Sequence, residues 1–315
     1  MSVAPVVLVY HPDEADAYAR LIRVPTGRDV AIHVCTTEPE AAAVIGRARV
    51  AYAWKLPVAL YAKASKLEWL QAMGAGVDWA LPGLPRRVVV TRAPGIFGPW
   101  MSEYVLGWCS WVTQRTESYR AAQRERRWIG DVVPGRLRGK TMTLVGVGDV
   151  GREIARVARA VGMHVIGVSR SGGRVPAVEH VYRPGYLGRA LAAADFVVVV
   201  LPLTRKTRGL IDERALAAMR PRAWLLNIGR GAVVDEAALL HALQTQRIAG
   251  AILDVFPTEP LPADHPLWGL DNVVITPHVA GPSTAEEIAP VFNDNLARWL
   301  RGRPLQHVVD RSRGY

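Results

Sequence analysis

An arginine, a glutamate and a histidine each follow a short apolar run in the C-terminal half of the chain. Arg230 occurs in Asn-Ile-Gly-Arg-Gly, Glu259 in Thr-Glu-Pro and His278 in Thr-Pro-His. An arginine can hold a carboxylate and polarise a neighbouring carbonyl through its fork of donors. A histidine can protonate the alkoxide that hydride attack creates, and a neighbouring carboxylate favours the imidazolium and fixes its orientation. These three residue types therefore suit hydride reduction of a 2-oxo acid.

A glycine motif lies upstream of these residues. Residues 141–145 form an apolar run that leads directly into Gly-Val-Gly-Asp-Val-Gly, which opens a helical pattern. In such a motif the first glycine permits a tight turn, the second lets the backbone approach a pyrophosphate, and the third packs the helix on the sheet. The N–H groups and the dipole at the helix N-terminus then hold the anion. The motif predicts a dinucleotide site made by Gly146, Val147, Gly148, Asp149, Val150 and Gly151.

The next predicted strand, residues 164–168, is followed by Ser169 and Arg170. A site selective for NAD usually has an acidic residue here, about 20 residues after the motif, to bind the ribose 2′-hydroxyl. An acid would repel a 2′-phosphate, whereas a serine and an arginine would hydrogen-bond it and neutralise its charge. The sequence therefore predicts that NADP(H) is preferred over NAD(H).

The elements that must position these side chains alternate between strands and helices. In a first series we expect strands at 6–10, 50–54, 69–72 and 88–91, with helices at 13–23 and 38–46. In a second series we expect strands at 141–145, 164–168, 196–200, 224–228, 251–255 and 273–276, with helices at 150–161, 212–219 and 235–244. Asp235 is the expected N-cap of the last of these helices. Apolar strands alternating with helices predict an α/β protein with two doubly wound parallel-sheet lobes.

The turn-rich residues 94–99 separate the two series, and a long helical pattern follows over residues 100–127. A last predicted helix, residues 285–301, lies beyond the second series and could return to the first lobe. We therefore expect one domain from residues 1–100 with 283–315, and a second from residues 101–282.

Composition excludes several classes of protein. The chain has 315 residues, of which 50% are hydrophobic, so it is not a disordered chain. The formal net charge of +11 raises the question of nucleic-acid binding, but the basic residues are scattered and no binding module is recognisable. Two distant cysteines have no metal-ligand spacing, and no apolar run reaches the ~20 residues of a membrane span. We expect a cytoplasmic protein with no metal, no nucleic-acid partner and no membrane partner.

Taken in order, the motifs make the chain resemble the D-isomer-specific 2-hydroxyacid dehydrogenase family over nearly its whole length. They lie at residues 146–151, 201–211, 227–231, 254–260 and 276–278. The resemblance implies a Rossmann dinucleotide-binding domain, a flavodoxin-like substrate domain, and a catalytic set of Arg230, Glu259 and His278. The cofactor contacts that it implies are Leu201, Pro202, Thr207, Ile228, Gly229, Arg230, Asp254 and His278. The substrate contacts that it implies are Gly74, Ala75, Gly76, Arg92, Arg230 and His278.

Within that family the chain looks closest to the glyoxylate/hydroxypyruvate reductase A branch, because of residues 101–104, 169–171 and 265–268. This implies NADPH-dependent reduction of small 2-oxo acids by an enzyme that forms a homodimer through its Rossmann domain. Residues 94–99 differ from that branch, so a bulkier 2-oxo acid reduced with NAD(P)H is an alternative. A dinucleotide-sensing, corepressor-like interaction protein is an alternative of another class, but the complete Arg–Glu–His set favours an enzyme.

Overall fold

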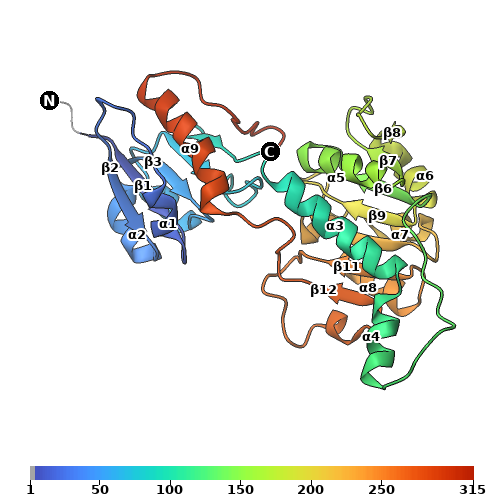
Figure 1. The fold of residues 1–315 in the computed structure, drawn as a ribbon. Coiled ribbons are helices and arrows are strands. Elements are labelled where there is room, and N and C mark those ends of the chain that lie inside the picture. The colour runs from blue at the N-terminus through green and yellow to red at the C-terminus, as the bar shows by residue number, and fades with distance from the viewer. Residues whose placement is uncertain (1–3) are drawn as a thin grey trace. The chain divides into compact units, whose positions relative to one another are not determined.

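The computed structural model describes residues 4–315 and shows two compact units. The first unit contains the chain up to Ile96 together with Ser283–Tyr315, and the second is Phe97–Pro282. Each unit is built around one all-parallel sheet with helices packed on it (Figure 1). The predicted α/β class with two doubly wound parallel-sheet lobes is confirmed.

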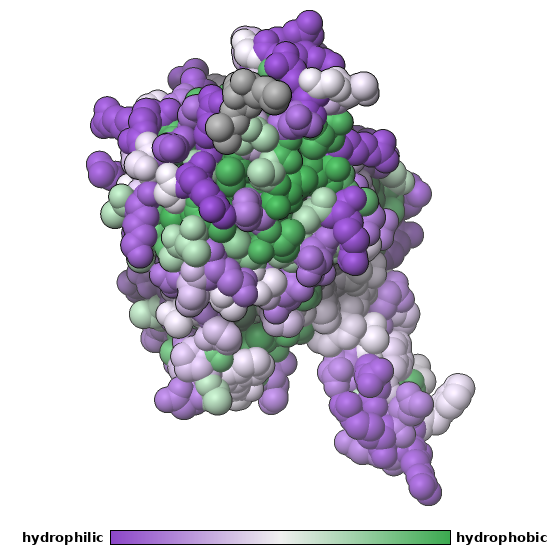
Figure 2. All heavy atoms as spheres, turned by 90° about the vertical axis from the view of Figure 1, so that its left-hand side faces the viewer, coloured by the Kyte–Doolittle hydropathy of each residue, from purple (hydrophilic) through white to green (hydrophobic). Residues whose placement is uncertain are grey.

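The sheet of the first unit has five strands in the order β2-β1-β3-β4-β5, the flavodoxin-like order. Its strands are β1 (Val6–Tyr10), β2 (Ala31–Cys35), β3 (Ala48–Ala53), β4 (Trp69–Ala72) and β5 (Val89–Thr91). Its helices are α1 (Ala15–Arg20), α2 (Glu38–Ile45), the 3-10 helix η1 (Val58–Lys63) and α9 (Ala285–Leu300). Figure 2 faces the viewer with one side of this unit, and hydrophobic residues gather in one area on that side.

The C-terminal helix α9 completes the first unit by covering its sheet. The ring of Phe292 stacks on Tyr52 of β3, with 4.0 Å between ring centroids, and lies 5.3 Å from Trp69 of β4. The amide of Asn295, which is fully buried, donates to Gln71 Oε1 at 3.2 Å. The end of the chain is therefore part of the first core, although more than 180 residues of the second unit separate it from β5.

The sheet of the second unit has seven strands in the order β12-β11-β10-β9-β6-β7-β8. Its strands are β6 (Thr141–Val145), β7 (His164–Val168), β8 (His180–Tyr182), β9 (Phe196–Val199), β10 (Trp224–Asn227), β11 (Gly250–Leu253) and β12 (Val273–Ile275). Its helices are α3 (Phe97–Thr113), α4 (Thr116–Arg124), α5 (Asp149–Ala160), α6 (Leu187–Ala192), α7 (Glu213–Ala218) and α8 (Glu236–Gln244). Strand order reverses between β6 and β9, which is where a doubly wound sheet binds its ligand.

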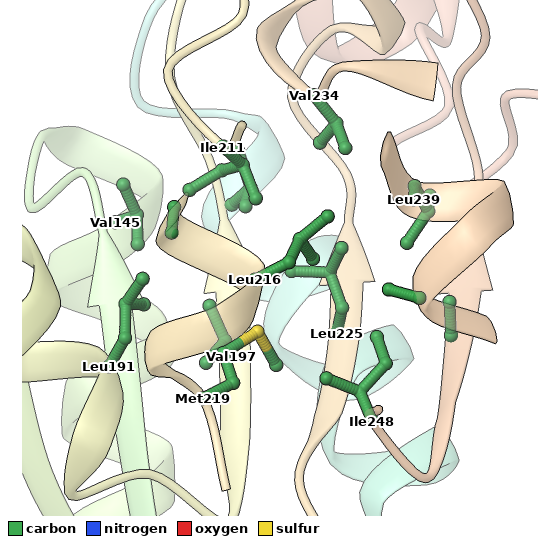
Figure 3. Packing of buried hydrophobic residues seen from close by; sticks show 14 of the residues in the cluster. Val145, Leu191, Val197, Ile211, Leu216, Met219, Leu225, Val234, Leu239 and Ile248 are labelled. Atoms are coloured by element: carbon green, nitrogen blue, oxygen red, sulfur yellow. The ribbon is translucent and has the colours of Figure 1, made fainter. Parts of the chain in front are cut away.

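Both faces of the seven-stranded sheet are covered, which explains why its strands are apolar throughout. On one face, Val197 and Leu225 pack with Leu216 of α7 and Leu239 of α8 (Figure 3). On the other face, Val198 and Leu226 pack with side chains of α3 and α5. The expected N-cap of α8 is confirmed, because the Asp235 carboxylate accepts from the Ala238 N–H at 3.0 Å.

The long helix expected over residues 100–127 is wrong in its extent. The structure has two helices, α3 and α4, because Arg115 adopts a left-handed conformation with φ of 57° and breaks the helix. The first helix begins at Phe97, so residues 97–100 belong to the second unit. The sequence pattern does not predict the strands β2 and β8 or the helix α6: β8 has only three residues, and polar residues or a glycine interrupt the apolar residues of β2 and α6. None of the helices among residues 4–315 has the length and hydropathy needed to cross a bilayer.

Candidate active site

The predicted site residues of the second unit all follow the carboxyl ends of parallel strands. Gly146 follows β6, Ser169 follows β7 and Leu201 follows β9, while Arg230, Asp254 and His278 follow β10, β11 and β12. Because the carboxyl ends of parallel strands lie at the same edge of a sheet, these residues all lie along one edge of the seven-stranded sheet.

The glycine motif forms an open cradle at the N-terminus of α5. Gly146 has φ of 114°, and a Cβ there would lie 2.5 Å from the carbonyl oxygen of Val200. A Cβ at Gly151 would lie 2.2 Å from the carbonyl oxygen of Gly146, so both positions require glycine for packing. At Gly148, by contrast, a Cβ would meet nothing within 4 Å. The residues present therefore fit a dinucleotide, whose pyrophosphate can approach at Gly148 and the helix N-terminus.

The first part of the loop after β7, residues 169–174, is organised by serine hydroxyls and contains no carboxylate. The Ser169 N–H donates to the Tyr182 carbonyl at 3.0 Å, and its Oγ accepts from the Gly172 N–H at 3.2 Å. Arg170 is exposed on this loop. The side chain of Arg183 lies across Gly172, where a Cβ would come within 2.8 Å of its Cγ. The sequence gives no signal for Arg183, because this residue follows β8, a strand that the sequence pattern does not predict.

The segment that carries His278 is wrapped around one buried carboxylate. Asp254 is 1% exposed, and its Oδ1 accepts from the Thr276 hydroxyl at 2.6 Å and from the Val279 N–H at 2.9 Å. Its Oδ2 accepts from the Ala280 N–H at 3.0 Å, and its main-chain carbonyl accepts from the His278 N–H at 2.9 Å. Asp254 therefore binds the backbone at His278 and at the two residues that follow it.

The His278 imidazole is held by a carboxylate that is itself held. Its Nδ1 lies 2.9 Å from Glu259 Oε2, and Glu259 Oε1 accepts from the Phe256 N–H at 3.0 Å. A carboxylate only accepts hydrogen bonds, so Nδ1 carries the proton in this pair. Nε2 is then the nitrogen that can gain or lose a proton. The backbone of His278 has φ of 56°, a left-handed conformation that costs a non-glycine residue about 1–2 kcal/mol.

Arg230 is half-buried, and a tight turn fixes the position of its backbone. The amide of Asn227 donates to the Arg230 carbonyl at 3.1 Å, and its Oδ1 accepts from the Gly229 N–H at 3.3 Å. A Cβ at Gly231 would lie 2.0 Å from the carbonyl carbon of Phe256, so only glycine allows this turn to pack on the segment that leads to Glu259. The turn thereby places the arginine loop directly against the glutamate loop.

The loop that follows β9 closes on itself. The Thr207 hydroxyl donates to the Pro202 carbonyl at 2.7 Å and accepts from the Thr204 N–H at 2.8 Å. A Cβ at Gly229 would lie 2.8 Å from the Leu201 carbonyl oxygen, so this loop packs against the turn of Arg230. Ile228, between Asn227 and Gly229, is buried.

Four predicted substrate contacts lie in the first unit, at the carboxyl ends of two neighbouring strands. Gly74, Ala75 and Gly76 follow β4, and Arg92 follows β5. The Ala93 N–H donates to the Gly74 carbonyl at 3.0 Å, so the two loops are adjacent. A Cβ at Gly74 would lie 3.0 Å from the Trp54 ring. The other two predicted substrate contacts, Arg230 and His278, lie in the second unit.

Two polar side chains near Asp254, those of Tyr104 and Thr276, lie within sequence motifs that do not by themselves predict a role for them. Thr276 bonds the Asp254 carboxylate, and the Tyr104 hydroxyl lies 2.6 Å from Thr276 Oγ1. The sequence signal for Tyr104 is a tyrosine in a mostly apolar helix, which does not identify its partner.

The chain is similar to proteins of known family. Residues 107–280 match the family described as D-isomer specific 2-hydroxyacid dehydrogenase, NAD binding domain. The chain is 31% identical over 273 residues to a glyoxylate/hydroxypyruvate reductase A of Serratia proteamaculans, with 84% of this chain and 87% of the relative covered. It is 33% identical over 275 residues to the reductase of that name from Escherichia fergusonii, with the same coverage of both chains.

Solved structures give the same result. A D-isomer specific 2-hydroxyacid dehydrogenase family protein from Aeromonas salmonicida superposes with a TM-score of 0.90 at 37% identity, covering 98% of this chain and 100% of the other. An NADPH-dependent glyoxylate/hydroxypyruvate reductase from Sinorhizobium meliloti, solved with NADP and sulfate, superposes with a TM-score of 0.88 at 31% identity. That match covers 99% of this chain and 100% of the other.

Two alanine substitutions in the glycine motif should affect different properties: Gly148→Ala the binding of NADPH, and Gly151→Ala the stability of the fold. Gly148→Ala meets open space, so we expect the free energy of unfolding to change by no more than about 0.5 kcal/mol. The added methyl group narrows the approach to the cradle, so the Kd of NADPH should rise about tenfold, the equivalent of 1.4 kcal/mol.

The matched variant Gly151→Ala places its methyl group against the Gly146 carbonyl and should lower the free energy of unfolding by about 1–3 kcal/mol. Urea unfolding and NADPH fluorescence titration measure the two quantities. A stable Gly151→Ala protein, or a Gly148→Ala protein that binds NADPH as the wild type does, would contradict this description of the cradle.

Proposed function

Because the chain belongs to the D-isomer-specific 2-hydroxyacid dehydrogenase family, we propose that it reduces small 2-oxo acids, of the glyoxylate and hydroxypyruvate type, with NADPH. The chain is an NAD(P)-dependent 2-hydroxyacid dehydrogenase, and the proposal concerns its substrate, its cofactor preference and its proton donor. The observation that carries the proposal is the 2.9 Å pair of His278 Nδ1 and Glu259 Oε2, which leaves Nε2 to deliver a proton.

In this proposal His278, Glu259 and Arg230 are the catalytic residues. His278 holds a proton on Nε2 and gives it to the carbonyl oxygen as negative charge develops there. Glu259 keeps the imidazole oriented and stabilises its charged form through Nδ1. Arg230 binds the substrate carboxylate and polarises the neighbouring carbonyl. We assign further substrate contacts to the backbone of Gly74–Gly76 and to Arg92.

Dinucleotide binding is proposed at the cradle of the glycine motif, and the neighbouring loops would hold the rest of the cofactor. When bound, the reduced nicotinamide supplies a hydride to the carbonyl carbon of the substrate. The residues proposed to hold the cofactor are Gly146–Gly151, Ser169, Arg170, Leu201, Pro202, Thr207, Ile228, Gly229, Arg230, Asp254 and His278. The basic loop at Ser169 and Arg170 supports a preference for NADPH, because a 2′-phosphate needs a cation and would be repelled by an acid.

The relatives support a small substrate. Those named glyoxylate/hydroxypyruvate reductase A are 31% to 33% identical to this chain. A bulkier 2-oxo acid is the alternative outcome of a substrate panel, which compares kcat/KM for glyoxylate, hydroxypyruvate and phenylpyruvate. A higher kcat/KM for the bulky acid would overturn the proposed substrate class.

We further propose a cytoplasmic homodimer that assembles through the second unit. On α3, Trp108 and Trp111 are only partly buried and make edge-on ring contacts with each other and with their neighbours. The segment that follows α4 carries Trp128, which is 98% exposed, and Val133, which is 79% exposed. Large apolar side chains exposed in this way are typical of an interface. Sedimentation velocity tests the assembly, and a monomer at micromolar concentration would remove this part of the proposal.

The His278→Ala variant should lose turnover while it keeps its cofactor. Without the proton donor, kcat should fall by about 10²–10⁴-fold. The Kd of NADPH should stay within about threefold of the wild-type value, because most of the proposed cofactor contacts remain and the main interaction lost acts in the transition state. Steady-state kinetics and NADPH fluorescence titration measure the two effects.

The matched control is His164→Ala, which removes a histidine that pairs with Glu179 at 2.9 Å and lies at the opposite, amino end of the sheet. It should retain wild-type turnover. A His278→Ala protein as active as His164→Ala would show that another group donates the proton.

The Arg170→Ala variant should lose NADPH selectivity. A charge-assisted contact to the 2′-phosphate contributes about 1.5–3 kcal/mol, so kcat/KM with NADPH should fall about ten- to a hundredfold. The value with NADH should stay within about twofold, because NADH has no 2′-phosphate. The control Arg222→Ala removes an exposed arginine at the amino end of β10. A wild-type enzyme that prefers NADH would overturn the proposed cofactor preference.

A further inference from the structure

A partly buried hydrogen-bond chain leads from helix α3 to Asp254, the residue that holds the His278 segment. The Tyr104 hydroxyl lies 2.6 Å from Thr276 Oγ1, and the Thr276 hydroxyl donates to Asp254 Oδ1 at 2.6 Å. Asp254 then accepts from the Val279 and Ala280 N–H groups, which follow His278 directly. Three segments distant in the sequence thus meet at Asp254, next to the segment that carries His278: α3, the end of β11 and the end of β12.

The direction of this chain follows from the chemistry of its members. A hydroxyl group has one proton, and a carboxylate can only accept, so the Thr276 proton goes to Asp254. The Tyr104 hydroxyl must therefore donate to Thr276 Oγ1. Burial raises the pKa of Tyr104 above its ordinary value, and the nearby Asp254 charge raises it too, although the Thr276 contact lowers it. The tyrosine consequently keeps its proton at neutral pH and acts as a donor.

Loss of these hydrogen bonds would disturb the segment that carries the catalytic histidine. Asp254 is buried, and a buried carboxylate depends on its donors for stability. The left-handed backbone at His278 is fixed by the bond between its N–H and the Asp254 carbonyl and by the two N–H bonds to the Asp254 carboxylate. Whatever moves Asp254 therefore also moves His278.

We propose that Tyr104 and Thr276 are positioning residues for the proton donor, acting through Asp254. They fix the Asp254 carboxylate so that residues 276–280 keep the conformation in which His278 faces the reacting carbonyl. This inference rests on the proposed function, because it assumes that His278 donates the proton. It assigns to a residue of α3 a share in catalysis although it touches neither substrate nor cofactor.

Conservative substitutions separate a positioning role from a purely structural one. Tyr104→Phe removes one donor and should lower kcat about five- to tenfold. Thr276→Val removes both hydrogen bonds of the threonine and should lower kcat about thirtyfold or more, whereas Thr276→Ser keeps the hydroxyl and should stay within about threefold of the wild type. In all three variants the KM for the 2-oxo acid should change by less than about twofold, because the contacts proposed for its carboxylate, Arg230 and the backbone of Gly74–Gly76, are unchanged.

Tyr119→Phe is the matched control. Its hydroxyl donates to the Val132 carbonyl at 2.7 Å in the same unit, in a partly buried setting, and has no link to Asp254. Both tyrosine variants lose one hydrogen bond, so a general loss of stability should affect them equally. Only Tyr104→Phe should lower kcat.

Amide hydrogen exchange provides a readout that is independent of activity. The N–H groups of His278, Val279 and Ala280 are all bonded to Asp254, so the peptide covering residues 276–282 should exchange about tenfold faster in Tyr104→Phe and Thr276→Val. Exchange elsewhere in the second unit should match the wild type, and Tyr119→Phe should leave this peptide unchanged.

Each outcome decides between the two claims. Wild-type exchange in the 276–282 peptide of Tyr104→Phe, or a kcat equal to that of Tyr119→Phe, overturns the positioning role. Faster exchange throughout the second unit also overturns it, because Tyr104 would then be a core residue only. If the wild type reduces no 2-oxo acid with either cofactor, the proposed function fails, while the exchange result still decides whether Tyr104 and Thr276 hold the loop.

Discussion

The buried carboxylate of Asp254 is the constraint on which the candidate site depends. Removing a charge from water is costly unless its oxygens are hydrogen-bonded, and Asp254 satisfies this with Thr276, Val279 and Ala280. Because two of these donors are backbone N–H groups, the same bonds that stabilise the charge also shape the chain after β12. His278 adopts its left-handed conformation inside that shape, where the hydrogen bonds offset the strain. Asp254 thus fixes the backbone of His278, and Glu259 orients its imidazole.

Close backbone contacts provide the second constraint. The turn that carries Arg230 packs on Phe256 through Gly231, and the loop at Leu201 packs on Gly229. Gly146 and Gly151 fix the start of α5 in the same way. These contacts allow loops from neighbouring strands to approach one another without side chains between them. The site is therefore assembled from rigid loop ends on a sheet whose two faces are both buried.

Much of this could be predicted from the sequence. The strands at residues 6–10, 69–72, 141–145 and 164–168 were predicted at their observed bounds, because apolar runs bounded by turns are clear signals for buried parallel strands. The glycine motif and the fold class followed from the same patterns. The break at Arg115 could not be predicted, since a single left-handed residue does not interrupt helical periodicity. Nor could the Tyr104–Thr276–Asp254 chain, because its members come from three distant segments and meet only through the fold.

The central claim is that the Asp254 carboxylate holds His278 in its working conformation, and a crystal structure of the Asp254→Asn protein tests it most directly. An asparagine has the same shape but turns an N–H₂ group toward one of the donors, so the three bonds cannot all be kept. We predict that residues 276–280 rearrange, that His278 leaves φ near 56° and that its contact with Glu259 is lost. A structure in which His278 keeps both its backbone conformation and its bond to Glu259 would contradict the account.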